Sequence, residues 1–86
     1  MILKIYVIKD KLVGFGGPIA MQDEKTARRM FESYCKRKKN EEYCEAKYFE
    51  LYETGTYDTE KGTMVGYPES GLQLIMEGEN FDEQKN

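Results

Sequence analysis

The sequence predicts an α+β fold in the order β-β-α-β-β, with one helix packed on a mainly antiparallel sheet. Two stretches, residues 2–8 and 47–58, alternate apolar and polar side chains as strands do. Between them, residues 23–39 repeat apolar side chains at helical spacing. Eighty-six residues suffice for one domain with a small core, and we expect that domain to occupy residues 1–76.

In the first strand, Leu3, Ile5 and Val7 alternate with Lys4 and Tyr6. We expect the aliphatic set to face the core, and Lys4 and Tyr6 to lie on the opposite, uncovered face of the sheet. The apolar run is too short to span a membrane, and no small-residue cleavage site follows it. It is therefore interpreted as a strand and not as a signal peptide, which favours an intracellular protein.

The stretch GFGGP at positions 14–18 has the composition of a phosphate-binding loop. A dinucleotide fingerprint, however, requires a third glycine or an alanine where this chain has Ile19, and the Gly-Lys-Ser/Thr ending of a Walker loop is absent. The predicted helix also begins too far beyond the glycines for both to bind one phosphate. We interpret the glycines as a bulge or bend in a second extended segment, residues 12–21, with Pro18 at a sheet edge.

The helix has the clearest signals. Asp23 is a suitable N-cap, and Glu24 favours the positive end of the helix dipole. Basic residues 36–39 lie at the negative carboxyl end, and Asn40 is predicted to close the helix. The predicted buried stripe consists of Ala27, Met30, Phe31, Tyr34 and Cys35.

After the helix, the chain is predicted to be extended from Ala46 onward. Phe49 and Leu51 are expected to face the core. The opposite face is expected to carry Tyr48, Glu50 and Tyr52.

The rest of the chain is predicted to form a hairpin and a tail. Residues 58–62 form the connection, with a positive φ at Gly62, and residues 63–67 return as the partner strand. Residues 72–76 form a last short strand or helical turn. Residues 77–86 are too polar to pack and are expected to be a flexible acidic tail.

Catalysis and metal binding have little support in the sequence. The chain has no histidine to act as a general base at neutral pH, and neither Ser33 nor Ser70 lies in a recognisable nucleophile motif. Its two cysteines, Cys35 and Cys44, cannot supply the four ligands of a zinc site. We expect no enzymatic activity, no metal and no cofactor, and we expect free thiols, with a disulfide between the two cysteines as the alternative.

The charge distribution is strongly polarised along the chain, although the net charge is only −3. Residues 1–39 contain ten basic and four acidic side chains, whereas residues 40–86 contain three basic and twelve acidic ones. This asymmetry indicates either a basic face that meets an anion and an acidic half that meets a basic partner, or neutralisation within the fold or between subunits.

Tyrosines suggest a binding surface. On the predicted uncovered face, Tyr6, Tyr48 and Tyr52 lie near Lys4, an arrangement typical of proteins that stack the bases of single-stranded nucleic acid and contact its phosphates. The alternative is a dimer interface or cross-strand packing, which Glu50 favours because it would repel phosphate.

The helix surface is a second candidate for phosphate contacts. Dipole compensation and solubility explain the same basic residues equally well. The residues in question are Arg28, Arg29, Lys36, Arg37, Lys38 and Lys39.

Three segments together resemble a known family: LKIYVIKD, GFGGPIAMQDEKTARRMF and ELYETGTYDTEKGTMVGYP. They are similar to the small nonstructural protein of gokushovirus-type microviruses, tailless bacteriophages with circular single-stranded DNA genomes. The resemblance covers roughly residues 1–70, its most specific part is LYETGTYDTEKG, and Asp23 stands where the family often has asparagine.

This resemblance implies a non-virion protein of the host cytoplasm that acts in genome replication or in the switch to single-strand synthesis and packaging. We therefore expect a homodimer that binds single-stranded DNA. The alternative is a protein-interaction module whose acidic half engages a phage replication protein or a host factor.

Overall fold

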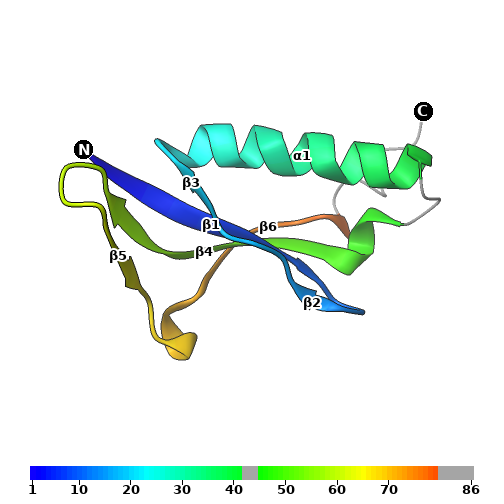
Figure 1. The fold of residues 1–86 in the computed structure, drawn as a ribbon. Coiled ribbons are helices and arrows are strands. Elements are labelled where there is room, and N and C mark those ends of the chain that lie inside the picture. The colour runs from blue at the N-terminus through cyan, green and yellow to red at the C-terminus, as the bar shows by residue number, and fades with distance from the viewer. Residues whose placement is uncertain (42–44, 80–86) are drawn as a thin grey trace.

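One long helix lies across one face of a six-stranded antiparallel sheet, so the predicted α+β class is confirmed (Figure 1). The structure is a computed structural model, and it describes residues 1–41 and 45–79. The strands are β1 (Ile2–Asp10), β2 (Gly14–Phe15), β3 (Ile19–Met21), β4 (Phe49–Asp58), β5 (Thr63–Gly66) and β6 (Gln73–Glu77). The helix α1 spans Glu24–Glu41, and two short 3-10 turns, η1 (Ala46–Tyr48) and η2 (Glu69–Gly71), precede β4 and β6.

The two long strands, β1 and β4, form the centre of the sheet and pair along their whole length. The second extended segment is divided in two: β2 and β3 both pair with β1, and the interruption between them is Gly16-Gly17-Pro18. On the far side, β5 and β6 both pair with β4. The predicted interruption of a sheet edge by the glycines and proline is therefore confirmed.

Helix α1 begins and packs as predicted. The Asp23 carboxylate accepts a hydrogen bond from the Thr26 amide at 2.8 Å, which satisfies one of the amides that a helix start leaves without an intrahelical partner. Ala27, Phe31 and Cys35 are completely buried against the sheet. The helix continues to Glu41, one residue beyond the predicted closing residue.

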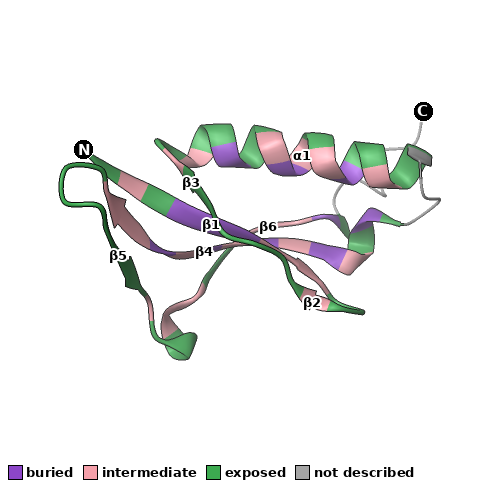
Figure 2. Ribbon diagram, in the orientation of Figure 1, coloured by how far each residue is buried: buried purple, intermediate pink, exposed green. Residues whose placement is uncertain are grey.

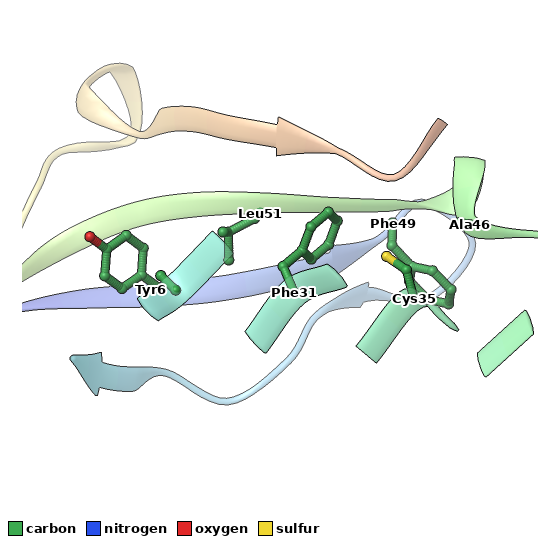
Figure 3. Close-up of a cluster of buried hydrophobic side chains, with 7 residues drawn as sticks. Tyr6, Phe31, Cys35, Ala46, Phe49 and Leu51 are labelled. Carbon is green, nitrogen blue, oxygen red and sulfur yellow. The ribbon is translucent and has the colours of Figure 1, made fainter. Parts of the chain in front are cut away.

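The core lies between α1 and the centre of the sheet (Figure 2). Figure 3 shows Phe31 and Cys35 of the helix close to Phe49 and Leu51 of β4. Phe49 and Leu51 face the helix, as predicted. The Cys35 side chain is buried in this cluster, whereas Cys44 lies outside the described residues.

The prediction that Tyr6 lies on the uncovered face is wrong, because its side chain is 0% exposed and belongs to the core (Figure 3). The register aligns Tyr6 with Glu53 and Ile8 with Leu51, which places both β1 side chains on the helix-covered face. Ile5, expected to face the helix, lies on the opposite face and is nevertheless buried. Because β1 is apolar on both faces, alternation alone separated its side chains into two sets without showing which set the helix covers.

The β4–β5 hairpin also forms as predicted. Gly62 has a φ of 68°, and its amide donates a hydrogen bond to the Asp58 carbonyl at 2.8 Å. Beyond the hairpin, β6 includes Glu77, which pairs with Glu50, and the Gly78 amide donates to the Phe49 carbonyl at 2.9 Å. The first two residues of the expected tail therefore lie in or beside the sheet, while residues 80–86 of that tail lie outside the described residues.

Candidate nucleic-acid interface

The face of the sheet opposite α1 carries an aromatic pair. Tyr52 pairs with Val7 and Phe15 pairs with Lys9, so all four side chains lie on this face. The Phe15 and Tyr52 rings meet edge to face with their centres 5.7 Å apart, and the Lys9 ammonium lies 5.4 Å from the centre of the Phe15 ring. Phe15 is 51% exposed, so its ring is available to a stacking partner.

Glu50 shares this face, but two neighbouring groups partly compensate the negative charge of its carboxylate. Tyr52 donates a hydrogen bond to one oxygen at 3.1 Å, and the Lys11 ammonium lies 3.9 Å from the other. Burial, followed by this hydrogen bond, raises the pKa of Tyr52 above its usual value, because loss of the phenol proton would break the bond to Glu50. The repulsion of phosphate by Glu50 is therefore weaker than the sequence alone indicates.

Tyr48 is not part of a strand, in contrast to the prediction. It ends the η1 turn, where its carbonyl accepts a hydrogen bond from the Lys11 amide at 2.8 Å. The Lys47 ammonium lies 5.5 Å from the centre of the Tyr48 ring. These contacts place Tyr48 beside the turn after β1, at one end of the sheet.

Lys4 and Tyr6 lie on the helix-covered face, so neither can act as part of an open stacking platform. The Lys4 ammonium lies 3.5 Å from the Glu53 carboxylate, which also accepts a hydrogen bond from the Tyr67 hydroxyl at 2.6 Å. Burial is the main cause that raises the pKa of Tyr6 to about 12, followed by the negative charge of Glu53. Within the described part of the chain, the Tyr6 hydroxyl has no hydrogen-bond partner.

The basic residues of the helix divide into two groups. Arg28 and Lys36 form ion pairs one turn away, with Glu24 at 2.8 Å and Glu32 at 3.1 Å respectively. In the second group, the Arg37 guanidinium and the Lys38 ammonium lie 5.6 and 5.5 Å from the centre of the Tyr34 ring. The remaining two, Arg29 and Lys39, are exposed. All six belong to α1, across the sheet from Tyr52, so a site that uses both sets must pass around a sheet edge.

A hollow of about 650 Å³ opens at the β2–β3 edge, between α1 and the glycine segment. Its walls combine apolar side chains and glycine residues with the polar residues Arg37, Ser33 and Asp10. Gly14 has a φ of 129°, a conformation that L side chains rarely adopt, and Gly16 and Gly17 follow it without side chains of their own. The lining residues are Ile8, Asp10, Val13, Gly14, Phe15, Gly16, Gly17, Ile19, Met30, Ser33, Tyr34 and Arg37.

Phe15 connects the two surfaces, because it lines the hollow and also contacts Tyr52 on the open face. Phe15 therefore links Tyr52 and Lys9 on the open face with Arg37, which lines the same hollow from the helix. Sequence reasoning missed Phe15 because the flanking glycines hide the alternation that identifies a strand face. Its position one residue after a glycine, and shortly after the basic residues Lys9 and Lys11, was the available signal.

A single phosphate held by the glycines and the helix start, as in nucleotide-binding loops, does not fit this geometry. The helix start is already occupied by Asp23, whose pKa is lowered mainly by the hydrogen bond from the Thr26 amide. Among residues 1–41 and 45–79, no three His, Cys, Asp or Glu side chains gather as a metal site. Nor does any helix within these ranges have the length and apolarity needed to cross a bilayer.

Comparison with known proteins identifies a phage family. The family model described as "Phage ORF5 protein" matches residues 3–81, which is nearly the whole chain. The chain belongs to the phage ORF5 protein family. No curated protein and no solved structure shows a significant match to it. The family membership makes this a phage protein, and the match extends past residue 70, where the resemblance seen in the sequence ended.

Proposed function

We propose that this phage ORF5 protein is a non-enzymatic accessory protein of a gokushovirus-type phage, and that it binds single-stranded DNA during genome replication or the switch to single-strand synthesis. The observation that carries the proposal is the exposed Phe15 ring, which packs against Tyr52 and lies beside Lys9 on the uncovered face of the sheet. Aromatic rings next to cations bind unpaired bases and their phosphates without sequence preference.

The path of the strand is proposed to follow the β2 edge. Bases stack on Phe15 and Tyr52, and the backbone continues over the glycine wall toward Arg37 on the helix. Arg28 and Lys36 contribute less than their charge suggests, because carboxylates on the same helix already pair with them. A duplex would not expose the faces of its bases to these rings, so the site favours single strands.

The test is a titration of a fluorescently labelled oligonucleotide over a salt series. Binding is expected to weaken steeply with salt, and Phe15→Ala is expected to lose about 1–3 kcal/mol, the usual contribution of one stacked base. Arg37→Gln should reduce the salt dependence as well as the affinity. Ile2→Ala is the matched control, because Ile2 is similarly exposed, at 58%, but lies at the end of β1 remote from Lys9 and the β2 edge.

Failure to bind any oligonucleotide at low salt contradicts the proposal. That result favours the alternative function, a protein-interaction module whose acidic half engages a phage replication protein or a host factor. Binding that Phe15→Ala leaves unchanged contradicts the proposed site but not the activity.

A further inference from the structure

Strand β5 presents an open edge. In the described sheet it pairs with β4 on one side and lies at the end of the strand order on the other. Figure 1 shows it directed away from the helix at the margin of the fold. An edge of this kind offers unpaired backbone groups to another strand.

The side chains of β5 do not protect this edge. The strand reads Thr-Met-Val-Gly, with no charge and no proline, and Met64 and Val65 are 61% and 63% exposed. The other edges are less suitable: Gly16-Gly17-Pro18 interrupts the β2–β3 edge, and β6 carries Glu77. Short unprotected apolar edges are the ones that pair with further strands.

The direction of the backbone groups follows from one hydrogen bond. The Tyr67 amide donates to the Thr54 carbonyl at 2.8 Å, so the backbone amide and carbonyl of Tyr67, the residue after β5, are directed toward β4. Because this direction alternates from one residue to the next along an antiparallel strand, the backbone groups of Thr63 and Val65 are directed toward β4 as well. Met64 and Gly66 therefore direct their amides and carbonyls outward, to the open edge.

We propose that β5 pairs antiparallel with β5 of a second copy of this chain, around a two-fold axis at Val65. In this register the outward groups of Met64 meet those of Gly66 in the other copy, which gives four backbone hydrogen bonds without displacing any existing bond. The two Val65 side chains meet at the axis. A register shifted by one residue would place outward groups opposite inward ones and is excluded.

Two further observations favour a second copy as the partner. The same register brings the Lys61 end of one strand to the Glu69 end of the other, so opposite charges meet twice. Met64 also borders an apolar hollow of about 250 Å³, lined by Ile5, Pro18, Ala20, Tyr57 and Met64, so the apolar surface of β5 continues onto the open face of the sheet, where the pairing joins it to the same surface of the second copy.

The dimer has a consequence for the proposed DNA site, and this consequence alone depends on the proposed function. A two-fold axis perpendicular to the sheet leaves both helices on one side and joins the two open faces on the other. Each copy then contributes one Phe15–Tyr52 pair to the same continuous surface. A four-residue strand pair buries less than the roughly 1,200–2,000 Å² of stable complexes, so we expect a dimer that dissociates on dilution.

The experiment is sedimentation velocity over a wide concentration range, without DNA. The natural protein is expected to change from monomer to dimer as its concentration rises. Val65→Lys, which puts two like charges at the axis, is expected to stay monomeric with an unchanged circular dichroism spectrum. Leu12→Lys is the matched control, since Leu12 is 71% exposed but distant from β5, and it should dimerise normally.

Amide hydrogen exchange on the natural chain provides a second test that needs no substitution. The Met64 and Gly66 amides should become more protected as concentration rises, whereas the Leu74 amide of β6 should not change. A chain that is monomeric at every concentration overturns the proposal, as does a dimer that Val65→Lys leaves intact or one without protection at Met64 and Gly66. Failure of DNA binding has no bearing on either measurement.

Discussion

The hydroxyl of Tyr6 offers the sharpest test of the core. It is buried between helix and sheet and has no hydrogen-bond partner in the described part of the chain. In the unfolded chain water solvates this group, so its burial without a partner costs about 1–3 kcal/mol. Tyr6→Phe removes the hydroxyl and keeps the ring, and we expect it to raise the free energy of unfolding by about 1 kcal/mol or more.

The assay is thermal and urea unfolding followed by circular dichroism. One kcal/mol corresponds to roughly 4–8 °C in Tm for a domain of this size, so the increase for Tyr6→Phe is readily measured. Tyr6→Ala is the contrasting variant, because loss of the buried ring should cost about 3–5 kcal/mol. An unchanged urea m-value would show that the effect is one of stability and not of compactness.

If Tyr6→Phe instead lowers the free energy of unfolding by 1 kcal/mol or more, this reasoning is refuted, because the hydroxyl must then make a favourable hydrogen bond. The same variant bears on the binding surface. Because Tyr6 is 0% exposed, Tyr6→Phe should leave oligonucleotide affinity unchanged. A change in affinity without a change in stability would return Tyr6 to the list of candidate contacts.

Three other predictions concern pH, the helix start and the dimer. Folding raises the pKa of Tyr6 from 10 to about 12, so the ionisation of Tyr6 does not affect the free energy of unfolding below pH 10. As pH rises from 10 to 12, this free energy should fall by roughly 2–3 kcal/mol, because the unfolded chain loses the Tyr6 proton first. Urea unfolding measures this decrease, and Tyr6→Phe should abolish the part of it that comes from Tyr6. Tyr67 adds to this loss in the same direction, because its pKa is also raised, mainly by its hydrogen bond to Glu53. Asp23→Ala removes the cap on Thr26 and should lower Tm by about 5 °C, whereas Asp23→Asn, which keeps a capping oxygen, should change it little. Val65→Lys should bind short oligonucleotides like the natural chain but longer ones less tightly, because only a dimer offers two joined stacking sites; equal affinity at both lengths would contradict this link.

Local signals in the sequence were sufficient wherever the determining contact lies within a few residues. The Asp23 cap, the buried stripe at Ala27 and Phe31, and the turn at Gly62 were all predicted, because each depends on backbone geometry or on spacing within a single element. The α+β class follows from the same local patterns, since one helical and several strand-like segments have few ways to form layers.

Tertiary structure alone decided which face of β1 the helix covers and which aromatic rings remain exposed. Tyr6 is in the core and Phe15 is at the open edge because register and helix placement, which depend on contacts distant in the sequence, select one of two apolar faces. The sequence by itself determined a small phage α+β domain with a basic first half and an acidic second half. Its fold determined that the Phe15–Tyr52 pair and the basic residues of α1 lie on opposite faces of the sheet, with Phe15 and Arg37 both at the hollow beside β2, because a sheet side chain can point to only one side.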